Sequence, residues 1–253
     1  DPKQIMKLIT KKTAAILPVH FAGIACNLNE ISQLCQENNI KLIEDAAHAA
    51  GTKYDGKKIG SHSMAVCFSF HPVKNLGMPT GGLISINHVN HRKLKKTLNE
   101  KRWCGITNRH DFTYDVKQVG WNYYMNEFSA GLGLIQLKKL DKLNRIRRNI
   151  AKRYYNEIEL EQKMPYIAGS SYHFYWIITR NRDKIMQKLK QNGIETGIHY
   201  RPIHKMTMYN TTNKLPVTEN VGKKIISLPT HPNLSEKDVT RIISLVNKFI
   251  RMN

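Results

Sequence analysis

Short apolar runs bounded by polar residues recur through the first half of the chain. Residues 40–43 and 64–67 form two such runs, and each is typical of a buried strand. Residues 14–19 and 83–86 indicate two more strands. Helical patterns lie between some of these runs, and such alternation predicts an α/β fold with a doubly wound, mostly parallel sheet.

The helical patterns have recognisable starts and stops. Residues 5–9 predict a short helix, and either Asn27 or Asn29 can cap a second helix that ends before the strand at 40–43. A much longer pattern, with apolar residues near helical spacing, predicts a helix over 126–159.

The second half has a different organisation, which predicts a small α+β domain. A strand is expected over 172–179, followed by a helix over 182–192 that Gly193 ends. Ser235 begins a capping-box-like start of a final amphipathic helix that ends near residue 251. We therefore expect a large domain over residues 1–145, which the long helix leaves, and a small C-terminal domain over residues 146–253.

Two candidate functional residues follow the two central strands. Asp45 comes directly after one run, and Lys74 comes shortly after the other. Ligands of such sheets bind beyond the carboxyl ends of the strands. There, an amine can form a Schiff base and a carboxylate can keep a pyridinium nitrogen protonated, which is the protein's share of pyridoxal phosphate (PLP) chemistry. Taken alone, a loop lysine and a turn aspartate are commoner explanations of the same residues.

The sequences of several segments favour the PLP interpretation of Lys74 and Asp45 over the ordinary one. Together they resemble the DegT/DnrJ/EryC1/StrS family, which are sugar aminotransferases of the fold-type I PLP superfamily, and the resemblance runs in order along the chain. The segments are AILPVHFAG at 15–23, IEDAAHA at 43–49, SFHPVKNL at 69–76, GWNYYMNE at 120–127, GIHY at 197–200 and SLPTHP at 227–232.

The resemblance assigns roles to five residues. It implies that Lys74 forms the Schiff base and carries protons, and that Asp45 pairs with the ring nitrogen. Glu44 is excluded from that role because it faces the opposite side of the strand. His48 matches a residue that touches the cofactor ring, and Ser69 matches a serine that contacts the phosphate. Both also have ordinary structural explanations, as a helix-start histidine and a strand-end hydroxyl bonded to its own backbone.

Asn122 matches an asparagine that reaches the cofactor phosphate of a neighbouring subunit. The resemblance therefore implies a homodimer with shared active sites. Lysine at position 74, where dehydrating relatives carry histidine, argues for transamination. The implied reaction converts a nucleotide-linked keto-sugar to an amino sugar, with glutamate as amino donor and 2-oxoglutarate as product. A cyclitol or aminoshikimate-type ketone is the alternative substrate.

Relatives also carry a further N-terminal segment with the rest of the large domain and the helix terminus that binds the cofactor phosphate. We therefore expect an N-terminally incomplete large domain. A fragment and a truncated, non-catalytic relative are both compatible with this expectation.

The bulk composition adds one unusual property, a formal net charge of +21. Such a charge attracts polyanions, but it is spread along the chain and no nucleic-acid motif accompanies it. A lysine-rich solvated surface explains most of it, with a contribution to capturing a diphosphate-bearing substrate. Four scattered cysteines without metal-ligand spacing predict reduced thiols and no metal site. Neither a signal peptide nor a long apolar run is present, so we expect a cytoplasmic enzyme without a membrane partner.

Overall fold

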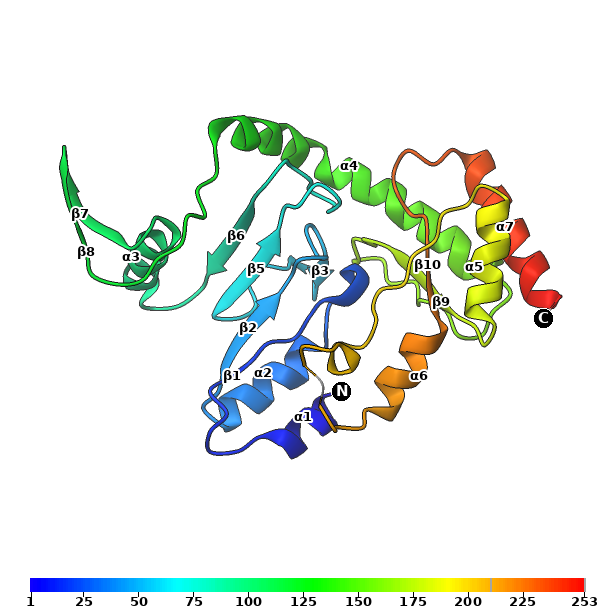
Figure 1. The fold of residues 1–253 in the computed structure, drawn as a ribbon, viewed down its shortest axis with the longest axis horizontal. Coiled ribbons are helices and arrows are strands. Elements are labelled where there is room, and N and C mark those ends of the chain that lie inside the picture. The colour runs from blue at the N-terminus through cyan, green and yellow to red at the C-terminus, as the bar shows by residue number, and fades with distance from the viewer. Residues whose placement is uncertain (210, 253) are drawn as a thin grey trace. The chain divides into compact units, whose positions relative to one another are not determined.

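The computed structural model describes residues 1–209 and 211–252. The chain divides into two compact units, Asp1–Asp141 and Lys142–Asn253. The first unit is built on a four-stranded sheet with the order β1–β2–β5–β6 (Figure 1). Three neighbours run parallel and the edge strand β6 is antiparallel to β5. Their bounds are Ala15–Ile16 for β1, Lys41–Asp45 for β2, Ala65–Ser69 for β5 and Gly82–Ile86 for β6.

The first strand is shorter than the predicted run of residues 14–19. Pro18 has no N–H to donate to a strand ladder, and β1 ends before it, at Ile16. The chain rejoins the sheet at Val19, which forms an isolated parallel bridge with Asp45. Residues beyond β1 therefore lie beside the carboxyl end of β2.

The predicted helices of this unit are present. Asp1 caps α1 (Pro2–Leu8), and Asn27 rather than Asn29 caps α2 (Leu28–Glu37) through the backbone N–H of Glu30. The apolar face of α2 packs against the residues that lead into β2. This core cluster contains Ile31, Cys35, Ile40 and Leu42.

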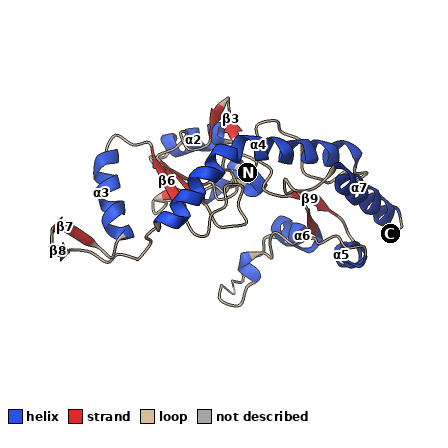
Figure 2. Ribbon diagram, turned by 90° about the horizontal axis from the view of Figure 1, so that it is seen from above, coloured by secondary structure: helices blue, strands red, loops and turns tan. Residues whose placement is uncertain are grey.

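The secondary-structure elements at one end of the first unit were not predicted from the sequence. It contains α3 (His91–Arg102) and the hairpin of β7 (Ile106–His110) and β8 (Thr113–Val116), which stand beyond β6 in both views (Figures 1 and 2). No residue of α3 is fully buried, and Leu94 and Leu98 are its only apolar residues, so periodicity marks this helix weakly. A second small hairpin joins β3 (Lys53–Tyr54) to β4 (Lys57–Lys58).

The second unit is α+β, as predicted. The long helix α4 (Glu127–Glu157) begins in the first unit and ends in the second. The strands β9 (Tyr175–Ile178) and β10 (Ile225–Leu228) pair antiparallel. The remaining helices are α5 (Arg182–Gln191), α6 (Pro216–Lys224) and α7 (Glu236–Arg251).

Two helix ends of this unit follow the sequence signals closely. Gly193 follows α5 with a φ of 72°, and Ser235 and Asp238 form a reciprocal capping box at the start of α7. Among the helices of the described residues, none is both long enough and apolar enough to cross a membrane.

Candidate active site

The site begins where two parallel strands end side by side. β2 ends at Asp45, β5 ends at Ser69, and Asp45 lies opposite Cys67 in the register between the two strands. The carboxyl ends of both strands therefore meet at one edge of the sheet, which is where ligands of α/β sheets bind. Lys74 follows β5 by a short turn and is half-buried.

A tight loop fixes the backbone of Lys74. The Lys74 N–H donates to the carbonyl of His71 at 2.8 Å, and the next residues, Asn75 and Leu76, are buried. Gly77 closes the loop so tightly that a Cβ there would lie 2.4 Å from the Pro72 carbonyl oxygen. The shape of the loop that carries Lys74 therefore depends on residue 77 having no side chain.

Electrostatics connect Lys74 to Asp45. Burial lowers the pKa of the Lys74 amine, and the nearby Asp45 carboxylate partly opposes this shift. Burial, together with the same carboxylate, also raises the pKa of the Cys67 thiol. Among the described residues, Lys74 forms no ion pair. A lysine of lowered pKa without a fixed partner is suited to act as a nucleophile.

The Asp45 carboxylate has one engaged oxygen. Its Oδ1 accepts the backbone N–H of Ala47 at 2.9 Å, which fixes the orientation of the group. No hydrogen bond among the described residues occupies Oδ2. Asp45 can therefore accept one further hydrogen bond from a cationic N–H.

His48 and Ser69 lie on the segments that flank this pair. His48 is buried, and its Nδ1 accepts the backbone N–H of Ala22 at 3.4 Å. The Ser69 hydroxyl accepts the N–H of His71 at 3.4 Å, so its own proton remains available to an anion.

Asn122 lies elsewhere in the first unit. It forms an isolated bridge with Trp103 and lines a cavity of about 1050 Å³ bounded by β6 and α3. The structure thus does not bring Asn122 together with Asp45 and Lys74, and its role toward a partner subunit stays a prediction.

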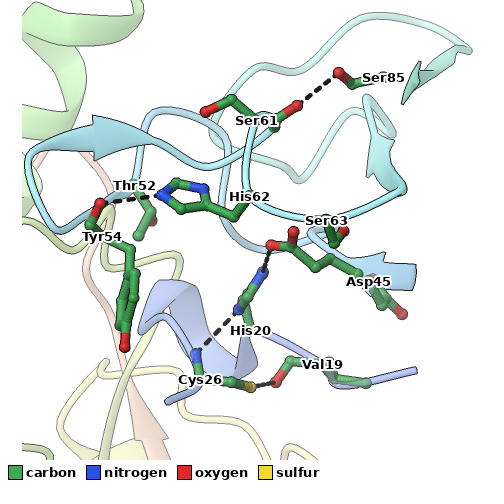
Figure 3. A network of polar contacts seen from close by, with 12 residues as sticks. Val19, His20, Cys26, Asp45, Thr52, Tyr54, Ser61, His62, Ser63 and Ser85 are labelled. Carbon is green, nitrogen blue, oxygen red and sulfur yellow. Dashed lines mark hydrogen bonds and ion pairs between the residues drawn. The ribbon is translucent and has the colours of Figure 1, made fainter. Parts of the chain in front are cut away.

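The sequence reasoning missed one polar pair, formed by His20 and Glu44. Both side chains are completely buried, and His20 Nε2 lies 2.7 Å from Glu44 Oε2. Figure 3 shows His20 between Cys26 and the strand that carries Asp45. Strand alternation predicted that Glu44 faces away from the cofactor side, but its partner lies 24 residues earlier and could not be read from spacing.

The residues at the strand ends fit the ring end of PLP. An amine of lowered pKa is present for the aldehyde, and a carboxylate oxygen is available for the ring N–H. A buried histidine adjoins the same edge, and a serine hydroxyl can donate to the phosphate. The donor set of the described residues therefore agrees with the cofactor that the sequence predicts.

Known proteins share both the sequence and the fold. The family model of the DegT/DnrJ/EryC1/StrS aminotransferase family matches residues 1–247. The uncharacterized protein MJ1066 of Methanocaldococcus jannaschii is 31% identical, over 99% of this chain and 70% of its own. Helicobacter pylori PseC, an aminotransferase involved in the biosynthesis of pseudoaminic acid, is also 31% identical. It has a TM-score of 0.91 over 100% of this chain and 71% of its own.

A third relative is described with the cofactor. The putative sugar aminotransferase Spr1654 of Streptococcus pneumoniae, in its PLP form, is 26% identical with a TM-score of 0.93 and covers 100% of this chain and 72% of its own. These likenesses confirm the predicted α/β fold of the PLP aminotransferases. Since the family match spans nearly all of the sequence, the chain belongs to the DegT/DnrJ/EryC1/StrS aminotransferase family and is a PLP-dependent transaminase.

Proposed function

We propose that this transaminase converts a nucleotide-linked keto-sugar to an amino sugar, with glutamate as amino donor. The observation that carries the reaction type is the placement of Lys74 beside Asp45 at the carboxyl edge of the sheet. The sugar substrate is supported by relatives that are themselves described as sugar aminotransferases or as acting in pseudoaminic acid biosynthesis.

Each residue of the candidate site would have a separate role in the reaction. When bound, PLP draws electrons from the substrate carbon that carries the amino nitrogen, so that the proton on this carbon becomes acidic. Lys74 Nζ would hold the cofactor and then accept and return that proton, which its lowered pKa favours. Asp45 Oδ2 would accept the hydrogen bond of the ring N–H, while Ala47 holds Oδ1 in place. His48 would lie against the ring, and the Ser69 hydroxyl would donate to the phosphate.

A basic groove supports a substrate that carries phosphate. It has a volume of about 590 Å³ and lies between α3 and β7 of the first unit. The one carboxylate in its lining, Glu100, is occupied by hydrogen bonds from Thr107 at 2.9 Å and Gln118 at 2.8 Å. The cations that line the groove are Arg92, Lys95, Lys96, Arg102 and Arg109.

None of these five cations takes part in an ion pair within the described part of the chain. Arginine and lysine without carboxylate partners bind phosphate oxygens through charge-assisted hydrogen bonds. Trp103, whose ring packs against Tyr124, also lines the groove and could contact a base. These features favour a nucleotide-linked sugar over an unphosphorylated ketone.

Borohydride reduction followed by peptide mapping tests the reaction type. The purified protein is incubated with PLP and then reduced. We expect the visible absorbance band of the bound cofactor to disappear on reduction, and the cofactor to remain attached to Lys74. Lys74→Ala should abolish the trapped adduct and turnover, whereas Lys53→Ala, at an exposed lysine of the same unit, should change neither. An adduct mapped to another lysine would refute the assignment.

Charge reversal in the groove tests the substrate class. Arg92→Glu/Lys96→Glu should raise KM for a nucleotide-linked keto-sugar by at least about tenfold, because each hydrogen bond to a charged group contributes roughly 1.5–3 kcal/mol. Lys138→Glu/Lys139→Glu makes the same charge change at exposed positions of α4 and serves as the control. Equal KM values in both variants would favour a cyclitol or aminoshikimate-type ketone.

We also propose that the working form is a cytoplasmic homodimer. All four cysteines are free thiols, which agrees with a reducing compartment. The exposed position of Asn122 leaves its side chain accessible to a second subunit.

A further inference from the structure

Two adjacent carboxylates on β2 have opposite environments. The strand places Asp45 on the side of Lys74, whereas Glu44 is completely buried on the other side. The only described partner of Glu44 is His20, at 2.7 Å, and the second carboxylate oxygen, Oε1, has no hydrogen-bond partner among the described residues. A carboxylate in such a place is costly unless it is fully satisfied.

The ring of His20 is held at both nitrogens. Its Nδ1 accepts the backbone N–H of Cys26 at 3.1 Å, so Nε2 carries the proton and donates to Glu44. Burial lowers the pKa of the His20 ring, but its contacts with Cys26 and Glu44 outweigh burial and raise the pKa to about 9. The geometry nevertheless favours the neutral tautomer with the proton on Nε2, because a second proton on Nδ1 would face the Cys26 N–H.

The backbone of the same segment holds Asp45 from both sides. The His20 N–H donates to the Asp45 carbonyl at 3.0 Å, and the Asp45 N–H donates to the Pro18 carbonyl at 2.9 Å. Two residues after His20, the N–H of Ala22 donates to the His48 ring at 3.4 Å. One segment therefore contacts both residues that the site needs beside the cofactor ring.

A stability role does not account for this arrangement. A buried carboxylate and its hydrogen-bonded partner can often be replaced together by apolar residues of similar volume without loss of stability. A pair that leaves one carboxylate oxygen unsatisfied is therefore a poor way to stabilise a core. Glu44 is adjacent to Asp45, and His20 lies on the segment that contacts His48. This position indicates that the pair serves the active site.

We propose that His20 and Glu44 are positioning residues, which fix the direction of the Asp45 carboxylate and of the His48 ring toward the cofactor. This inference rests on the proposed function, since it assumes that Asp45 serves the PLP ring. The pair acts through the backbone of residues 18–22 and β2, and neither side chain needs to touch the cofactor itself.

The test uses one double variant and three readouts. His20→Leu/Glu44→Leu removes both polar partners and leaves no buried charge. We expect the variant to unfold at a temperature close to that of the parent. Its PLP affinity, from absorbance titration, should fall by about tenfold, which is the lower end of what loss of an outer hydrogen-bonding partner costs in metal sites. The visible circular dichroism per bound cofactor should fall as well, because the ring is held less uniformly.

Two conservative variants keep the test decisive if the double variant does not fold. His20→Gln places an amide N–H near the position of Nε2 and can still donate to Glu44. His20→Asn places its oxygen near the position of Nδ1 and keeps the Cys26 bond only. We expect His20→Gln to retain PLP affinity and His20→Asn to lose it.

The controls separate the two hypotheses. Tyr154→Phe removes a buried hydroxyl on α4 and should leave PLP affinity and circular dichroism unchanged. If the parent protein binds PLP through Lys74 but the double variant, or both His20 variants, keep the parent's affinity and dichroism, the positioning role is wrong. If the parent protein forms no borohydride-trapped adduct at Lys74, the proposed function itself fails.

Discussion

A single methyl group at Gly77 should disturb the catalytic lysine without touching it. A Cβ at this position would lie 2.4 Å from the Pro72 carbonyl oxygen and 3.3 Å from the Lys74 carbonyl oxygen. Both atoms are backbone atoms of the loop that carries Lys74, so no flexible side chain can move aside. Separations under 3.0 Å are essentially never seen for a real Cβ, and Gly77→Ala must therefore shift the loop.

Two magnitudes follow. Forcing a methyl group into a well-packed site typically costs about 1–3 kcal/mol, and each kcal/mol lowers the melting temperature of a chain of this size by roughly 2–4 °C. Activity should suffer more, because a displacement of about 1 Å at a reacting group can cost about a hundredfold in rate. We thus expect a modest loss of stability and a large loss of kcat/KM.

The assay compares Gly77→Ala with Gly131→Ala. Gly131 lies on α4, where a new Cβ would meet nothing within 4 Å. Alanine is favoured over glycine in a helix by about 1 kcal/mol, so this control should be slightly stabilised and fully active. Melting temperature, PLP affinity and kcat/KM are measured for both. If Gly77→Ala matches Gly131→Ala in all three, the close approach of this loop does not set the position of Lys74.

Three further predictions concern other parts of the chain. Asp45→Asn removes the charge that raises the pKa of Lys74, so acylation of Lys74 in the cofactor-free protein should begin at lower pH; mass spectrometry would show a shift to higher pH if the coupling is misassigned. Tyr154→Phe leaves the Pro229 carbonyl without its 2.7 Å partner, and urea unfolding should show a loss of about 1–3 kcal/mol; an unchanged free energy of unfolding would show that this hydrogen bond contributes nothing. Asn122→Ala subunits, mixed with Lys74→Ala subunits, should regain activity that neither variant has alone; no recovery in verified mixed dimers contradicts a shared site.

The sequence predicted the parts of the fold whose signals are local. The caps at Asn27 and Ser235 are each formed within three residues; Ser235 was predicted, and Asn27 was one of two predicted candidates. The short apolar run that became β6 follows the pair Gly81 and Gly82, and this local signal needed no distant partner. In such elements, the residues that define the structure are also neighbours in the sequence.

The elements that were missed depend on contacts across the fold. α3 is rich in lysine and arginine and fully buries no residue, so periodicity marks it only weakly. β10 has the opposite problem, because all four of its residues are buried and an apolar run without alternation does not distinguish strand from helix. Its pairing with β9 is what makes it a strand.

The site shows the same limit at a finer scale. Alternation along β2 was enough to predict that Asp45 and Glu44 face opposite sides, because that rule needs only the strand itself. It could not predict that Glu44 would be buried against His20, since that contact joins segments 24 residues apart. The alternation rule also does not explain why β2 carries a second carboxylate, Glu44, that is buried in the protein core. The hydrogen bonds of His20 and Pro18 to the backbone of Asp45 supply a reason, because they couple the buried pair to the direction of the half-buried Asp45 carboxylate. A residue that sequence reasoning sets aside as facing the wrong way can therefore be the one that holds its neighbour in place.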